Sequence, residues 1–140
     1  MARENVFADS AFLYALVDRR DSAHRAAVEQ LGALTRENRS LVSTDYVVAE
    51  ALTLTKSRAG SGVALRLLDR IESTNLLRIE WIGAERFAQT KVFFRRHADH
   101  DYSFTDCTSF VVMRELKITD ALTTDGHFAE AGFRPLLPLV

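Results

Sequence analysis

Short apolar segments alternate with longer amphipathic segments along most of the chain, and this alternation restricts the fold more than any other feature. The short segments are rich in β-branched, aromatic or leucine residues, and we predict strands at residues 5–9, 40–44, 76–82, 120–124 and 133–137. The longer segments have the apolar spacing of helices: 11–18, 21–38, 46–57, 61–74, 83–97 and 105–117, with a short helical turn at 126–132. Strands joined through helices form parallel sheets covered on both faces. The pattern therefore predicts an α/β fold, a three-layer α/β/α sandwich with a central, mainly parallel sheet.

The bulk properties are those of one domain. The chain has 140 residues, and no repeat, low-complexity stretch or change of composition marks a linker. The longest wholly apolar run, residues 11–17, is far too short to cross a bilayer, and the first residues carry charges instead of an apolar signal core. The single cysteine, Cys107, excludes an internal disulfide framework and fits a reducing compartment. We therefore expect a cytoplasmic protein with no membrane partner.

The charge balance leaves nucleic-acid binding open. The net charge is −1, which does not by itself indicate a nucleic-acid-binding protein. The basic residues are fifteen arginines against three lysines, and the planar guanidinium group binds phosphate oxygens in pairs. A GC-rich genome would produce the same arginine bias, so both explanations stand.

Four carboxylates lie in segments that are otherwise apolar or hydroxylic, and none has an arginine or lysine within three positions: Asp9, Glu50, Asp106 and Asp125. In the predicted sheet, Asp9 and Asp125 end strands, and Asp106 begins a helix. Glu50 lies about two turns into the helix that follows the second strand. Ligands of such sheets bind beyond the carboxyl ends of the strands. The topology therefore predicts that the four acids meet at one edge of the sheet.

A group of unpaired carboxylates indicates a cation. Such groups repel one another, and burying each of them is unfavourable, so either they become protonated or a cation lies between them. Oxygen ligands suit hard cations, chiefly Mg²⁺ or Mn²⁺, and two such ions about 4 Å apart can activate water and stabilise the leaving oxygen of a phosphodiester. Each aspartate taken singly could equally cap a helix, but Glu50 lies too far into its helix to do so. The set therefore indicates a metal site more strongly than any one member.

Three blocks of the sequence resemble the PIN domain family, and within it the VapC-type toxin ribonucleases of toxin–antitoxin pairs. They are VFADSAFLYAL near the start, TDYVVAEALTL in the middle, and SFTDCTSFVVMRELKI followed by ALTTDGHFAEAGF near the end. The blocks extend over essentially the whole chain, so the resemblance implies a single PIN domain over residues 1–140. The acids of the family map without substitution onto Asp9, Glu50, Asp106 and Asp125.

The resemblance implies a metal-dependent endoribonuclease that hydrolyses RNA phosphodiester bonds with Mg²⁺ or Mn²⁺ and acts as a toxin. It implies three partners: an RNA substrate, a cognate antitoxin protein and a second copy of the chain in a homodimer. The four acids are then both catalytic and metal-binding. Asp9 and Asp106 would be the principal ligands, with Glu50 and Asp125 completing the shell through water.

Hydroxyl side chains near these acids have two possible roles. Ser10 and Thr105 are predicted N-caps, because each stands before an apolar helical run. Hydroxyls can also hydrogen-bond metal-binding carboxylates. The candidates for this second role are Ser10, Thr44, Thr105 and Thr124.

Several other residues fit a site less well. His97 and His100 have a spacing that zinc sites use, but further ligands are missing nearby in the sequence, so we interpret 97–101 as a solvated loop. Asp101 could lie at the rim of the site, and His127 could contact a phosphate or simply pack. Cys107 has no adjacent base and is interpreted as a buried structural thiol. We interpret five phenylalanines as core residues and not as base-stacking surfaces: Phe93, Phe94, Phe104, Phe110 and Phe128.

Two other function classes remain as alternatives. A phospho-receiver or aspartyl-phosphate enzyme would use a similar sheet, but that chemistry usually needs paired acids after the first strand, and Ala11 stands two positions after Asp9. A non-cleaving PIN-like module that binds RNA or protein would have the same fold. The intact set of acids favours the nuclease over both.

Overall fold

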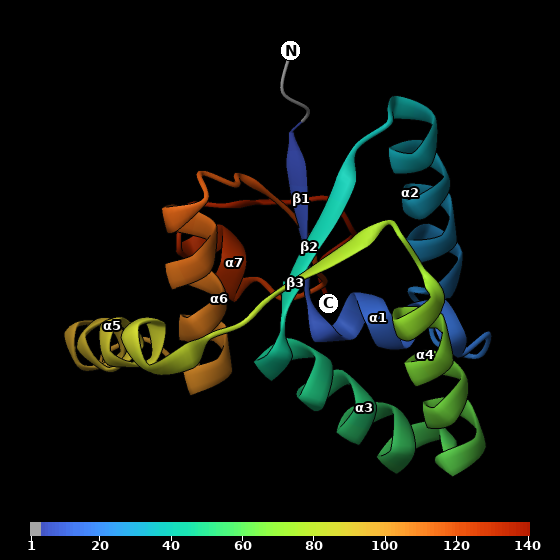
Figure 1. The fold of residues 1–140 in the computed structure, drawn as a ribbon, viewed down its shortest axis with the longest axis horizontal. Helices are drawn as coiled ribbons and strands as arrows, with labels where there is room; N and C mark the ends of the chain where they lie inside the picture. The colour runs from blue at the N-terminus through green and yellow to red at the C-terminus, as the bar shows by residue number, and fades with distance from the viewer. Residues whose placement is uncertain (1–3) are drawn as a thin grey trace.

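A computed structural model describes residues 4–140, and its central element is one parallel sheet (Figure 1). Within these residues, five strands are arranged in the order β3-β2-β1-β4-β5, and every adjacent pair is parallel. The predicted sheet is confirmed, although four of its strands are shorter than predicted. The strands are β1 (Asn5–Ala8), β2 (Ser40–Thr44), β3 (Leu77–Glu80), β4 (Asp120–Leu122) and β5 (Arg134–Pro135).

Helices cover both faces of the sheet, so the predicted three-layer α/β/α sandwich is confirmed. Helices α1 to α4 pack together on one side, and α5 to α7 lie on the other (Figure 1). The chain moves from β1 through β2 to β3 and then returns past β1 to β4, so right-handed crossovers place the later helices on the opposite face. The seven helices between residues 4 and 140 are α1 (Ser10–Val17), α2 (His24–Glu37), α3 (Asp45–Ala59), α4 (Ser61–Ser73), α5 (Gly83–Arg96), α6 (Phe104–Glu115) and α7 (His127–Glu130).

The core is centred on β1, the middle strand. Val6, Phe7 and Ala8 have no exposed surface, because helices cover both faces of this strand. Phe12 on α1 and Phe110 on α6 are also fully buried. The end of β1, from which Asp9 follows, is therefore held in place by the core.

Helix α5 is less buried than the sequence suggested. Phe94 is 43% exposed, so its interpretation as a core residue is wrong, and Phe104 is only half-buried beside it. Figure 1 shows why: α5 extends away from the sheet and contacts mainly α6. Among residues 4–140, no helix is both long enough and apolar enough to cross a membrane.

The amino edge of the sheet contains a buried ion-pair cluster. Asp120, the first residue of β4, is 4% exposed. Its carboxylate accepts hydrogen bonds from Arg134 Nε and Nη2 and from Arg39 Nη2, each at 2.8 Å. The Arg134 and Arg39 guanidinium groups hold the pKa of Asp120 below its ordinary value. This buried acid thus has the cationic partners that a buried charge requires.

We expect Asp120→Ala to lower the free energy of unfolding by about 2 to 3 kcal/mol, because it leaves Arg39 without its buried partner. The contribution of Asp120 is present at neutral pH and is lost as the pH falls through its lowered pKa. Urea denaturation at pH 7 measures the change. Arg20→Ala is the control, since Arg20 is 83% exposed beside Asp18 and its loss should change stability by less than about 0.5 kcal/mol. Equal effects of the two substitutions would contradict this account.

Candidate metal centre at the carboxyl edge

The four predicted acids come from elements that meet at the carboxyl edge of β1 and β4, where the strand order reverses. Asp9 directly follows β1, and Asp125 follows β4 after two threonines. Asp106 lies in the first turn of α6, and Glu50 is in the second turn of α3. Ligand sites of parallel sheets form at such reversals, because the crossover helices diverge there and leave a crevice.

Asp9 is the most buried of the four, with 6% of its surface exposed. Its Oδ2 accepts a hydrogen bond from Thr123 Oγ1 at 2.7 Å. The pKa of Asp9 is raised to about 7, chiefly by burial and to a smaller extent by the nearby charges of Asp106 and Glu50, against the lowering effect of hydrogen bonds from Thr123 and the Ser10 backbone. A carboxylate in this environment is poorly solvated and gains from a neighbouring cation.

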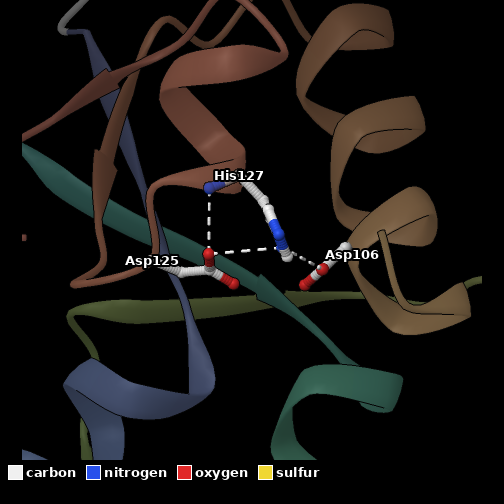
Figure 2. A group of neighbouring side chains, drawn as sticks. All are labelled: Asp106, Asp125 and His127. Atoms are coloured by element: carbon white, nitrogen blue, oxygen red, sulfur yellow. Dashed lines mark hydrogen bonds and ion pairs between the residues drawn. The ribbon is translucent and has the colours of Figure 1, made fainter. Parts of the chain in front are cut away.

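Asp106 and Asp125 approach the same point in space from α6 and from the segment after β4, and His127 lies between them (Figure 2). One ligand atom from each residue can be chosen so that all three lie within 4.8 Å of one another. His127 Nδ1 is 3.4 Å from Asp106 Oδ2 and 3.3 Å from Asp125 Oδ1. Burial raises the pKa of Asp106, and the charge of Asp125 adds to this effect.

Glu50 is exposed and lies beside an open cleft. Ser10 Oγ donates a hydrogen bond of 2.6 Å to Glu50 Oε1, which holds the carboxylate next to the start of α1. The cleft has a volume of about 850 Å³, and Tyr46, Thr53 and Thr105 line it together with Glu50. An extended ligand in this cleft would therefore lie next to Glu50 and Thr105.

The hydroxyl residues only partly follow the prediction. Ser10 is not an N-cap, because α1 begins at Ser10 itself and Asp9 occupies the cap position; instead it hydrogen-bonds Glu50 as the second prediction proposed. Thr105 is not an N-cap either: Ser103 caps α6 and forms a reciprocal pair with Asp106. Thr44 caps α3.

Sequence reasoning selected the wrong threonine after β4. The side chain on Asp9 is Thr123, whereas Thr124 is bound through its carbonyl oxygen to Val140 N. Thr123 Oγ1 also accepts from Asp125 N at 3.0 Å, so one hydroxyl links two of the acids. The pair of threonines before an acid was a visible signal, but choosing between them required knowing that β4 ends at Leu122.

The donors present suit a divalent cation. Among residues 4–140, no arginine or lysine forms an ion pair with Asp9, Glu50, Asp106 or Asp125; the single cationic candidate near them is His127. Carboxylate oxygens are the ligands that Mg²⁺ and Mn²⁺ prefer. This contrasts with Asp120, where two arginines supply the positive charge.

The charge on Asp9 should destabilise the protein when divalent ions are removed. Because the folded state binds the Asp9 proton more tightly than the unfolded state, stability falls as the pH rises from about 4 to about 7. In EDTA at pH 8, we expect Asp9→Asn to be more stable than wild type by on the order of 2 kcal/mol, with the difference vanishing below about pH 4. Asn keeps an oxygen that can accept from Thr123.

Urea denaturation in EDTA across this pH range measures the difference, with Asp69→Asn on the exposed face of α4 as the control. Adding Mn²⁺ at pH 8 should make wild type more stable than Asp9→Asn, because an ion that binds the folded wild type stabilises it. Wild type as stable as Asp9→Asn in EDTA at pH 8 would contradict the proposed effect of burial.

Comparison with known proteins identifies the family of this chain. The PIN domain family matches residues 6–134. The 23S rRNA-specific endonuclease VapC20 of Mycobacterium tuberculosis is 32% identical over 133 residues, which cover 95% of this chain and 98% of the relative.

Solved structures show the same fold. The crystal structure of M. tuberculosis VapC20, a sarcin–ricin loop cleaving toxin, has a TM-score of 0.84 and 30% identity and covers 95% of this chain and 99% of its own. VapBC2 from Rickettsia felis, bound to a promoter DNA fragment, has a TM-score of 0.67 at 12% identity, covers 94% and 96% of the two chains, and shows the fold alone. From the match over residues 6–134 and the identity to VapC20 over nearly its full length, this chain belongs to the PIN domain family.

Proposed function

We propose that this chain is a metal-dependent endoribonuclease and the toxin of a toxin–antitoxin pair. The observation that carries the proposal is the set of carboxylates without arginine or lysine partners at the carboxyl edge of the sheet. Asp106 and Glu50 lie close enough to Asp9 to raise its pKa, and Asp106 and Asp125 share His127. The match to the PIN domain family and the similarity to the endonuclease VapC20 support the same conclusion.

In this proposal Asp9, Asp106, Asp125 and Glu50 hold one or two Mg²⁺ or Mn²⁺ ions. Such ions would supply an activated water and neutralise the charge that develops on the phosphate. Asp9 is held rigidly by Thr123 and the core beneath β1, so it provides a fixed oxygen. Glu50 is exposed at the cleft and can orient a water molecule or accept its proton, with Ser10 restricting its position.

The substrate we propose is RNA, and specifically 23S rRNA. This choice comes from the relative VapC20, which is a 23S rRNA-specific endonuclease, and from the length over which the two chains match. The open cleft beside Glu50 is large enough to hold a segment of single-stranded RNA. As VapC20 is a toxin, we propose a cognate antitoxin protein as the second partner of this chain.

Purified protein should cleave 23S rRNA in the presence of Mg²⁺ or Mn²⁺ but not in EDTA. Asp9→Asn and Asp106→Asn should each reduce the cleavage rate at least about 100-fold, because each removes a carboxylate from the metal site. Primer extension on RNA from treated ribosomes measures the rate and locates the cut.

Asp69→Asn is the matched control, since it removes one exposed negative charge from α4 and should leave cleavage unchanged. Circular dichroism checks that each variant is folded. Undiminished cleavage by folded Asp9→Asn would falsify the proposal. Binding of 23S rRNA without any cleavage would favour a non-cleaving PIN-like module.

We also propose that the protein forms a homodimer through α5 and Trp81, which lies two residues before this helix. This segment exposes Trp81, Phe87, Val92 and Phe94, with exposed fractions from 37% to 71%. Large apolar side chains grouped on one projecting element are typical of protein–protein contacts. Phe87 and Phe94 are seven positions apart, which places them on the same side of α5, and both contact Phe104 of α6. They support a self-association surface on the side of the molecule that α5 and α6 form (Figure 1).

Phe94→Glu should shift the protein from dimer to monomer, because a carboxylate would be placed in an apolar contact. Light scattering coupled to size-exclusion chromatography measures the mass. Leu65→Glu on α4 is the control, since Leu65 is 59% exposed and lies outside this surface. A monomeric wild type, or a dimer that tolerates Phe94→Glu, would rule out this contact.

A further inference from the structure

Within residues 4–140, His127 is the one nitrogen donor among the acids of the proposed metal site, and its position is unusual for a simple hydrogen-bonding residue. Its Nδ1 lies at nearly equal distances from two carboxylates, 3.4 Å from Asp106 Oδ2 and 3.3 Å from Asp125 Oδ1 (Figure 2). Good N–H···O hydrogen bonds cluster near 2.9 Å, so both distances are long for direct hydrogen bonds. The side chain of His127 is 32% exposed, and an ion could therefore reach it.

The distances agree better with three ligands around one ion. Neighbouring ligands of an octahedral ion, each about 2.1 Å from it, lie about 3 Å apart. The Nδ1 atom has this relation to oxygens of both Asp106 and Asp125, and the three ligand atoms form one compact group. The carboxylates come from different elements, so the imidazole completes a site that neither α6 nor the segment after β4 forms alone.

The protein holds the His127 ring in this place. The backbone N–H of His127 donates to Asp125 Oδ1 at 2.9 Å, which ties the start of α7 to that carboxylate. Tyr102, 7% exposed, meets the His127 ring edge to face with centroids 5.5 Å apart. His100 stacks on Tyr102 at 4.7 Å and limits the movement of that tyrosine.

We propose that His127 is a direct ligand of the divalent ion through Nδ1, so that the site is a mixed nitrogen and oxygen set and prefers Mn²⁺ to Mg²⁺. The inference rests on the proposed metal-dependent function and refines it. Mg²⁺ binds oxygen ligands almost exclusively, whereas affinity for imidazole increases toward the transition metals. Replacing His127 should therefore weaken Mn²⁺ binding much more than Mg²⁺ binding.

Pulsed electron paramagnetic resonance of the Mn²⁺-loaded full chain tests the inference directly. We expect electron spin echo modulation from a bound ¹⁴N nucleus in wild type, its loss in His127→Gln, and its retention in His100→Gln, whose ring contacts Tyr102 but not the acids. Calorimetric titration should give a Mn²⁺ affinity reduced about tenfold in His127→Gln and a Mg²⁺ affinity reduced much less.

The outcomes separate this inference from the proposed function. Mn²⁺ binding that is lost in Asp106→Asn but shows no ¹⁴N modulation in wild type would overturn the role of His127 and leave the carboxylate metal site intact. If neither Asp106→Asn nor Asp9→Asn affects Mn²⁺ binding, both the role of His127 and the proposed carboxylate metal site are overturned. The wild-type spectrum is decisive even where a variant fails to fold.

Discussion

The burial of Asp9 at the carboxyl edge of the sheet, close to the charges of Asp106 and Glu50, is the constraint on which the rest of this structure depends. Asp9 is nearly fully buried, and its raised pKa records the unfavourable free energy of holding its charge there. The buried residues Val6, Phe7 and Ala8 of β1 and the Thr123 hydroxyl keep it in place. The stability of the core thus supports a local arrangement that is electrostatically unfavourable and that a bound cation would relieve.

The pKa values of buried acids shift in opposite directions at the two edges of the sheet. At the amino edge, Asp120 lies between Arg39 and Arg134, and its lowered pKa shows that the protein itself stabilises the charge. At the carboxyl edge, Asp9 and Asp106 have raised pKa values, and their partners within the described part of the chain are hydroxyl, backbone and imidazole groups. A structural acid receives a permanent counter-charge, whereas a metal-binding acid must leave that place free for the ion.

Much of the fold could be predicted because it depends on local patterns. The five strands, the six longer helices and their parallel connection all follow from apolar periodicity and from the handedness of crossovers. Helix starts were less predictable. Ser10 and Thr105 have the chemistry of N-caps, but Asp9 and Ser103 occupy those positions, since the end of a helix depends on contacts from other elements. Phe94 was misjudged for a similar reason, because burial depends on what lies opposite a residue.

The sequence by itself determined the chemical character of the site: four acids without nearby arginine or lysine, placed after strands or within the first two turns of helices in a parallel α/β fold. Only the tertiary structure decided which side chains support them. Thr123, and not Thr124, bonds Asp9 because β4 ends at Leu122, and His127 joins Asp106 because α6 and α7 pack together. These pairs are far apart in the chain, and their contact depends on the ångström-scale packing of separate elements. Such packing depends on all the side chains of the core together, so it cannot be read from the type and spacing of a few residues.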